Sequence, residues 1–174
     1  MSSINRMLVV TLLLLVSTAD AQQGEAYRLA AGDKVAISVF GENDLSMSLI
    51  LGEDGVLKYP FLGEIEVAGL TAPELERTIA DGLRGDYLIN PEVTVRVEEY
   101  RPFFLNGEVN RPGSYEFQPG LTLEKALALA GGLSPRAARG KIEVKRADSD
   151  SFVRIQMNDP VYPEDIIRVP QSFF

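Results

Sequence analysis

The sequence has no cysteine, no histidine and no tryptophan among its 174 residues. Without cysteine, disulfides cannot support the fold. Without histidine, the chain lacks the usual base that activates a serine hydroxyl, and its serines stand mostly in loops beside acidic residues. No glycine-rich turn opens a helix where it could cradle a phosphate. We therefore expect no enzymatic activity and no cofactor.

Basic residues are scarce as well. The sequence has 17 lysines and arginines against 25 aspartates and glutamates, which gives a formal net charge of −8. Binding to phosphate groups needs basic side chains concentrated on one face, and the sequence shows no such cluster. We expect no nucleic-acid partner and no attraction to an anionic lipid surface.

Only one long apolar run is present, Met7 to Val16. It follows a short, weakly basic head and precedes Ala19-Asp20-Ala21, a small-x-small cleavage site, so residues 1–21 are predicted to be a signal peptide. The alternative is a membrane anchor, but a helix of about ten residues rises roughly 15 Å, half of a bilayer core of about 30 Å. Gln22 stands where a lipoprotein would carry its cysteine, and we expect an exported protein that is not a lipoprotein.

The first part of the mature chain, residues 22–101, mixes short strands with one helix. Apolar residues at every second position, Val35, Ile37 and Val39, predict a half-buried strand. The stretch LILGEDGVLKYPFLGEIEVAGL predicts short strands joined as a hairpin at Asp54-Gly55. A second alternating pattern in NPEVTVRVEEY predicts a later strand with its valines facing inward.

The helix of this part is predicted from TAPELERTIADGLRG. Thr71 and Glu74 have the spacing of a capping box, and Pro73 stands in the first turn, where its missing N–H costs nothing. Leucines and an isoleucine recur on one face, at Leu75, Ile79 and Leu83. Gly85 is the predicted end of the helix.

The second part, residues 102–174, begins where Arg101-Pro102 breaks the strand pattern. It predicts a hairpin over residues 103–117 that turns at residues 110–113, and then a helix capped by Thr122. Gly131 and Gly132 predict a left-handed exit from this helix. KIEVKR and FVRIQM predict a second hairpin, and DIIRVP a last strand. Hairpin, helix, hairpin and strand is the order of a β-grasp, so the class of the whole chain is α+β.

Three groups of residues could carry chemistry or binding. Two pairs of carboxylates could serve as the acid and base of a glycosidase, Glu42 with Asp44 and Glu53 with Asp54. Both pairs lie in predicted turns, where no apolar neighbour would raise the pKa of one carboxyl group. Asp148 and Asp150 resemble a fragment of a calcium loop that lacks its further ligands. The tyrosines could stack on sugar rings, although tyrosines at strand ends commonly serve packing.

Several stretches resemble a known family. YRLAAGDKVAISVFGENDLS, LGEDGVLKYPFLGEIEVAGLTAPELERTIADGL and YLINPEVTVRVEEYR resemble the polysaccharide biosynthesis/export domain of outer-membrane polysaccharide export proteins. GEVNRPGSYEF, LTLEKALALAGGLS and PEDIIRVP are similar to the soluble-ligand-binding β-grasp (SLBB) module that follows it in those proteins. The two resemblances cover nearly all of the mature chain, in the order of the family.

The pattern of the family falls on turn and cap positions, which the resemblance marks as shape-setting rather than catalytic. In the first module these are Gly32, Asp33, Asp54, Gly55, Pro60, Gly63, Gly69, Leu70, Thr71, Asn90 and Pro91. In the second module they are Gly107, Glu108, Val109, Pro112, Gly113, Ala130, Gly131 and Gly132. The resemblance implies a surface shaped for the stacking of subunits.

The family also implies a function and partners. The expected function is that of a periplasmic, non-catalytic homo-oligomer, which forms a ring for exopolysaccharide or capsule export and associates peripherally with the outer membrane. The expected partners are the polysaccharide and an inner-membrane polysaccharide co-polymerase. Larger members add a lipid-bearing cysteine, further β-grasp repeats and a C-terminal pore helix, so we expect this short form to rely on a separate outer-membrane β-barrel. The alternatives are a monomeric periplasmic oligosaccharide-binding module and an enzyme that trims the polymer.

Overall fold

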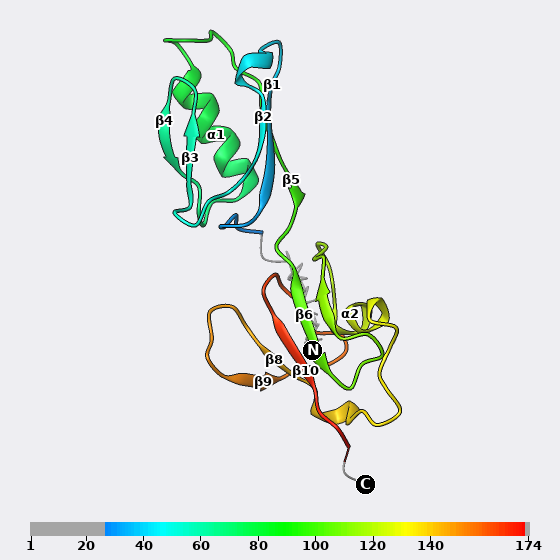
Figure 1. The fold of residues 1–174 in the computed structure, drawn as a ribbon. Coiled ribbons are helices and arrows are strands. Elements are labelled where there is room, and N and C mark those ends of the chain that lie inside the picture. The colour runs from blue at the N-terminus through cyan, green and yellow to red at the C-terminus, as the bar shows by residue number, and fades with distance from the viewer. Residues whose placement is uncertain (1–26, 173–174) are drawn as a thin grey trace, which may run out of the picture.

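The computed structural model describes residues 27–172, which form two modules placed end to end (Figure 1). The predicted signal peptide, residues 1–21, lies outside the described residues. The elements of the first module are β1 (Lys34–Val39), η1 (Asn43–Leu45), β2 (Met47–Ile50), β3 (Val56–Tyr59), β4 (Gly63–Glu66), α1 (Ala72–Leu83) and β5 (Val93–Glu99). Those of the second are β6 (Phe103–Gly107), β7 (Gly113–Tyr115), α2 (Leu123–Leu129), η2 (Arg139–Lys141), β8 (Glu143–Lys145), β9 (Phe152–Arg154) and β10 (Ile166–Val169).

β1 is the central strand of a three-stranded antiparallel sheet in the order β2-β1-β5. Burial alternates along β1 as the sequence predicted, because Val35, Ile37 and Val39 are buried and the residues between them are not. Val95 of β5 stands opposite Ile37 and is buried too. Successive side chains of a strand point to opposite faces, so these residues form one apolar face against which α1 packs.

The start of α1 confirms the predicted capping box. The Thr71 side chain accepts a hydrogen bond from the backbone N–H of Glu74, and the Glu74 carboxylate accepts one from the backbone N–H of Thr71 at 2.7 Å. Leu75, Ile79 and Leu83 are fully buried, as their spacing predicted. In Figure 1 the helix lies between the three-stranded sheet and the β3–β4 hairpin.

The predicted hairpin at Asp54-Gly55 is wrong. A turn does form there, but it joins β2 to β3, and these two strands belong to different sheets. β3 pairs instead with β4, through a turn at residues 60–62. The reason lies in the carbonyl of Gly55, which accepts hydrogen bonds from the N–H groups of Val67 and Ala68 at 2.9 and 3.1 Å. The turn therefore closes on the chain after β4, while β2 is already paired with β1.

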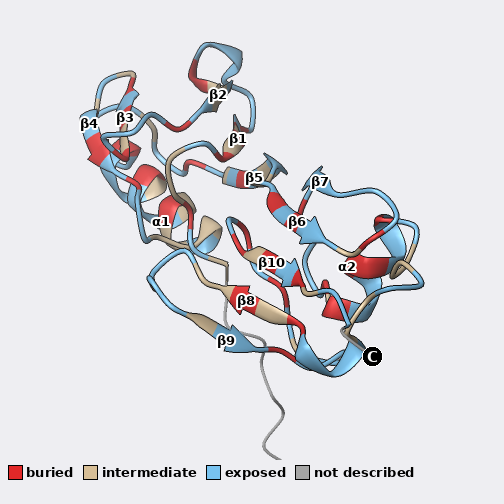
Figure 2. Ribbon diagram, turned by 60° about the horizontal axis from the view of Figure 1, so that its bottom comes forward, coloured by how far each residue is buried: buried red, intermediate tan, exposed pale blue. Residues whose placement is uncertain are grey.

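The second module is a five-stranded sheet in the order β7-β6-β10-β8-β9, and this confirms the predicted β-grasp. The last strand, β10, inserts between the two hairpins, parallel to β6 and antiparallel to β8. Phe103, Leu105 and Ile167 of the central strands are fully buried in one cluster with Leu123 and Ala126 of α2. Figure 2 shows the buried side of α2 and the exposed outer strands.

Both helices are short, with 12 residues in α1 and 7 in α2. Thr122 caps α2 as predicted, because its side chain accepts a hydrogen bond from the N–H of Lys125. Within residues 27–172, neither helix has the length and apolar character needed to span a bilayer.

Candidate functional site

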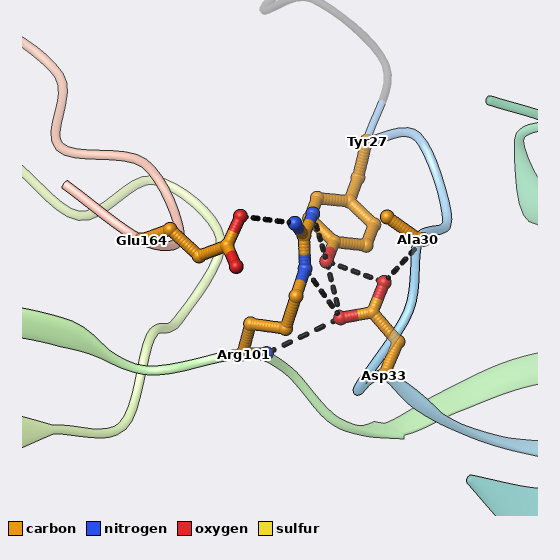
Figure 3. Close-up of polar contacts among 5 residues, drawn as sticks. All are labelled: Tyr27, Ala30, Asp33, Arg101 and Glu164. Atoms are coloured by element: carbon orange, nitrogen blue, oxygen red, sulfur yellow. Dashed lines mark hydrogen bonds and ion pairs between the residues drawn. The ribbon is translucent and has the colours of Figure 1, made fainter. Parts of the chain in front are cut away.

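The two modules meet at a cluster of polar side chains from segments far apart in the sequence (Figure 3). Asp33 comes from the turn that leads into β1, and Arg101 from the connector between β5 and β6. Tyr27 stands ahead of the first strand, and Glu164 lies in the turn before β10. We call these four residues the junction cluster.

Asp33 is the centre of the junction cluster and is completely buried. Its Oδ1 atom accepts hydrogen bonds from the Tyr27 hydroxyl at 2.6 Å and from the backbone N–H and Nε of Arg101, both at 3.2 Å. Its Oδ2 atom accepts one from the N–H of Ala30 at 2.9 Å. Arg101 also donates through Nη1 to the Glu164 carboxylate at 2.6 Å. One guanidinium therefore bridges both modules.

The electrostatics of the junction cluster favour a single arrangement of the two modules. Burial raises the pKa of Tyr27, and the neighbouring Asp33 carboxylate raises it further, so the phenol stays protonated and acts as a donor. The Arg101 side chain is only 17% exposed and faces two carboxylates. A buried ion pair adds little net stability, but removal of one partner costs about 3–5 kcal/mol because the other charge is left unpaired. A different angle between the modules would break the pair between Arg101 and Glu164, the one ion pair of the cluster that reaches the second module.

Glu164 reaches Arg101 from an unusual backbone conformation. Its φ is +65°, in the left-handed region that residues other than glycine seldom adopt and that costs about 1–3 kcal/mol. Its N–H donates to the carbonyl of Pro102 at 2.8 Å. Backbone and side chain of Glu164 therefore both tie the turn before β10 to the connector.

Aromatic rings line the junction beside the polar cluster. The rings of Tyr27 and Tyr100 meet edge to face with centroids 4.8 Å apart, and Phe117 lies 5.6 Å from Tyr100. Next to them is a cleft of about 620 Å³, which we call the junction cleft and which Tyr27, Phe117 and Tyr162 line together with prolines and two arginines. Tyr27 belongs to both groups, since its ring packs on Tyr100 and its hydroxyl donates to Asp33.

The family-pattern positions of the second module gather at the C-terminal end of α2. Gly131 and Gly132 have φ values of 76° and 87°, so the chain leaves the helix in the predicted left-handed conformation. The N–H of Gly132 donates to the carbonyl of Leu127 at 2.8 Å, the bond that defines a Schellman motif. The β6–β7 turn covers this exit, since the N–H of Arg111 donates to the carbonyl of Ala130 at 3.0 Å.

Two further positions of the pattern fix the β6–β7 turn in place. Gly107 has a φ of 88°, and a Cβ atom there would lie 2.1 Å from the carbonyl oxygen of Val169. The Glu108 carboxylate accepts a hydrogen bond from the Ser134 hydroxyl, and the Glu108 carbonyl accepts one from the Ser134 N–H at 3.0 Å. The turn is therefore attached to β10 on one side and to the chain after α2 on the other. Val109, Pro112 and Gly113 belong to the same turn and the start of β7.

The family-pattern positions of the first module do not gather at one place. Gly32 and Asp33 lie at the junction. Gly69 lies nearby, because its N–H donates a hydrogen bond to the segment just ahead of β1. Asp54 and Gly55 lie in the turn between β2 and β3, and Leu70 and Thr71 lie directly ahead of α1. Pro60 lies in the β3–β4 turn, Gly63 begins β4, and Asn90 and Pro91 lie in the loop between α1 and β5. The structure thus places Asp33 in the junction cluster. It also brings the family-pattern positions of the second module close to one another.

The sequence did not reveal Tyr27, Arg101 and Glu164 as partners of Asp33. It predicts only a break in the strand pattern at Arg101 and packing for the tyrosines, and it gives no signal for Glu164. The available signal was an arginine placed directly between two modules, beside an aspartate at the start of a buried strand. Only the fold brings these segments together.

The residues considered for catalysis or metal binding are dispersed. All four carboxylates are exposed: Glu42 and Asp44 lie at η1, and Glu53 and Asp54 in the turn between β2 and β3. Asp150 faces Lys145, with the carboxylate oxygen 3.4 Å from Nζ. Within the described part of the chain, no three acidic side chains come close enough to hold a metal ion.

Known families match the chain in two consecutive segments. Residues 21–98 match the polysaccharide biosynthesis/export protein family, and residues 102–162 match the SLBB domain. The two matches follow one another without overlap, in the order of the two modules described above.

Curated relatives match both modules. The chain is 31% identical over 140 residues to the exopolysaccharide production protein ExoF of Rhizobium meliloti, across 74% of this chain and 33% of that protein. It is 32% identical over 106 residues to the EPS I polysaccharide export outer membrane protein EpsA of Ralstonia nicotianae, across 59% and 28%. It is 26% identical over 139 residues to the polysialic acid transport protein KpsD of Escherichia coli, across 78% and 24%. The chain thus spans a third or less of each relative's length. Taken with the two domain matches, these likenesses show that the chain belongs to the polysaccharide biosynthesis/export protein family, with an SLBB domain after the domain that defines the family.

Proposed function

We propose that this protein is a ring-forming component of an exopolysaccharide or capsule export machine, which guides the polymer through the periplasm towards the outer membrane without catalysis. The two domain matches support a role in polysaccharide export. The relatives are named for exopolysaccharide production, polysaccharide export and polysialic acid transport. One of them is named as an outer membrane protein, which supports a location near that membrane.

The observation that carries the proposal of assembly is a set of exposed apolar side chains at the far end of the first module. Phe40 and Ile89 are 83% and 95% exposed. Phe61 and Tyr87 stack with ring centroids 4.7 Å apart and are also exposed. We call these four residues the apolar end. They come from the loop after β1, the β3–β4 turn and the loop after α1, which lie away from the junction (Figure 1). Exposed apolar side chains at one end of a module favour a contact with another protein surface there.

The junction cluster supports closure of such an assembly into a ring. Because Arg101 is bonded to Asp33 of the first module and Glu164 of the second, each copy would present its contact surfaces at the same angle. A head-to-tail contact repeated at a constant angle closes into a ring when the rotation allows it. We assign the apolar end to the contact with a neighbouring copy.

The proposal places the ring between two further proteins. An inner-membrane polysaccharide co-polymerase would supply the polymer on one side, and a separate outer-membrane β-barrel would complete the exit. The protein itself would provide a lined passage for the polysaccharide and no reacting group.

The apolar end gives the test. The double variant Phe40→Ser and Ile89→Ser should remain folded, because both side chains are exposed, but should shift from the ring to the monomer. Native mass spectrometry and crosslinking in cells would follow the assembly, and secreted polymer would be weighed. The matched control is Val153→Ser on β9, a side chain that is 50% exposed on the other module. A wild-type protein that stays monomeric in both measurements would overturn the ring, and unchanged assembly in the double variant would exclude the apolar end as its interface.

A monomeric oligosaccharide-binding module is the second candidate, and the junction cleft favours it. Its three aromatic side chains could stack on sugar rings within a volume of about 620 Å³. Saturable binding of an oligosaccharide by a strict monomer, with no crosslinked ladder in cells, would support this candidate over the ring.

A further inference from the structure

Two arginines of the second module have no polar partner for their guanidinium groups in the portion of the chain that the structure describes. Among residues 27–172, the guanidinium groups of Arg139 and Arg154 form no ion pair and donate no hydrogen bond. Arg96 on the first module is the one other described arginine of which this is true. Unpaired arginines are unexpected in an acidic protein that has many carboxylates available.

Both arginines line one cleft. It has a volume of about 530 Å³ and lies between η2 and the chain that follows β9. The amides of Gln156 and Asn158 line it as well, and Gly140 leaves its backbone open to it. We call these five residues the basic cleft. Sequence alone did not suggest it, because η2 and the end of β9 are separated by the β8–β9 hairpin.

The charge of the protein is distributed so that an anion would prefer the second module. Residues 27–101 carry 7 basic and 14 acidic side chains, a net charge of −7. Residues 102–174 carry 9 of each, a net charge of zero. An anion is therefore repelled by the first module and meets unpaired guanidinium groups on the second.

The walls of the basic cleft are held by backbone hydrogen bonds. The N–H of Ile155 donates to the carbonyl of Ile142 at 3.1 Å, and the N–H of Glu124 at the start of α2 donates to the carbonyl of Met157 at 3.0 Å. The Asp159 carboxylate also lines the cleft, and within its own turn it accepts a hydrogen bond from the N–H of Gln156 at 2.7 Å. A cleft with fixed walls loses little entropy when a ligand binds.

The side chains of the basic cleft suit one class of ligand. A guanidinium group binds a carboxylate through two parallel hydrogen bonds. Side-chain amides donate and accept, which matches sugar hydroxyl groups. The exposed Met157 adds an apolar contact for the C–H face of a sugar ring. We propose that the basic cleft binds an acidic segment of the exported polysaccharide, a sugar that carries a carboxylate. This inference rests on the proposed function, since it names the chemistry of the polymer.

The test uses defined oligosaccharides and the mature protein. A hexamer of galacturonic acid and cellohexaose, its neutral counterpart in length, would be titrated while amide shifts or heats are recorded. We expect saturable binding of the acidic hexamer, with shifts at residues 139–142 and 154–159. Arg139→Gln with Arg154→Gln should weaken binding at least about tenfold, the factor that corresponds to the loss of roughly one charge-assisted hydrogen bond. Gly140→Leu should fill part of the cleft while both arginines remain, because Gly140 lines it, and the protein should stay folded because a Cβ there would meet nothing within 4 Å.

The matched control is Arg77→Gln with Arg96→Gln, which removes the same charge from the first module and should change the affinity less than about twofold. Equal binding of cellohexaose, equal binding of a glutamate hexapeptide, or an equal loss in the control would each overturn the inference. Ring formation is recorded in the same samples by native mass. A ring that does not bind the acidic hexamer rejects the basic cleft and leaves the proposed function intact. A monomer that binds it rejects the ring and retains the cleft.

Discussion

The buried carboxylate of Asp33 accepts hydrogen bonds from the backbone and from two other side chains of the junction, Tyr27 and Arg101. Asp33→Ala should lower the free energy of unfolding by about 3–5 kcal/mol, because Arg101 would lose its buried carboxylate partner and the Tyr27 hydroxyl its acceptor. Denaturant unfolding measures this loss.

The control for Asp33 is Asp86→Ala, which removes an exposed carboxylate of the same module and should change stability by less than about 0.5 kcal/mol. If both substitutions cost the same small amount, Asp33 would not be the centre of the junction that its hydrogen bonds suggest.

Gly107 is the position where the backbone leaves least room. Gly107→Ala would put a Cβ atom 2.1 Å from the carbonyl oxygen of Val169, at a φ of 88° that alanine disfavours. Since β6 and β10 pair at this point, we expect a loss of about 3 kcal/mol or more and unfolding of the second module, seen by thermal melting. Gly140→Ala, where nothing lies within 4 Å, should melt within a few degrees of the wild type. Similar melting of both variants would contradict the close approach.

Among the elements, α1 offers a pH-dependent test. The hydrogen bonds from the Thr71 backbone and side chain lower the pKa of Glu74 below its ordinary value of 4.5. A depressed pKa means that the folded state prefers the ionised carboxylate. The contribution of Glu74 is therefore complete above pH 4.5 and is lost as the pH falls through the lower pKa of the folded state.

Glu74→Gln keeps an acceptor for the Thr71 N–H but cannot ionise. We expect the variant to melt below the wild type at pH 7 and the gap between the two to close as the pH is lowered to 3. Melting temperatures across this range provide the measurement, and a gap that stays constant or widens towards pH 3 would show that ionised Glu74 adds nothing to the cap.

The elements that the sequence predicted are those with local signals. α1 could be predicted because its capping residues and its apolar face lie within one segment, and β1 and β5 because strict alternation requires one buried face. The prediction of a hairpin at Asp54-Gly55 was wrong because a turn dipeptide determines where the chain turns but not which strands pair. The junction cluster could not be predicted, since its four residues come from segments separated by up to 137 positions, from Tyr27 to Glu164. The basic cleft could not be predicted either, because it combines η2 with the end of β9 and neither segment contains a pattern that indicates a binding site.

The relative orientation of the two modules depends on Arg101, which lies in the connector and is hydrogen-bonded to both modules. Its Nε is 3.2 Å from Asp33 and its Nη1 is 2.6 Å from Glu164. Arg101→Gln would remove the charge that faces these two carboxylates, while the separate cores of the modules would stay intact. We therefore predict a protein whose modules remain folded but whose relative orientation is no longer fixed.

The absence of native cysteine makes this prediction direct to measure. Spin labels on Thr78→Cys in α1 and Ala128→Cys in α2, both exposed positions, would report the distance between the modules. The wild-type pair should give one narrow distance distribution and Arg101→Gln a broad one. Arg96→Gln, an exposed arginine of β5 without such contacts, should leave the distribution narrow. If the ring requires a constant angle between modules, Arg101→Gln should also reduce assembly. The second module should melt close to the wild type, and the first should melt lower because the buried Asp33 carboxylate loses its ion pair. A narrow distribution in Arg101→Gln would mean that the aromatic contacts of Tyr27, Tyr100 and Phe117 fix the angle without the ion pairs.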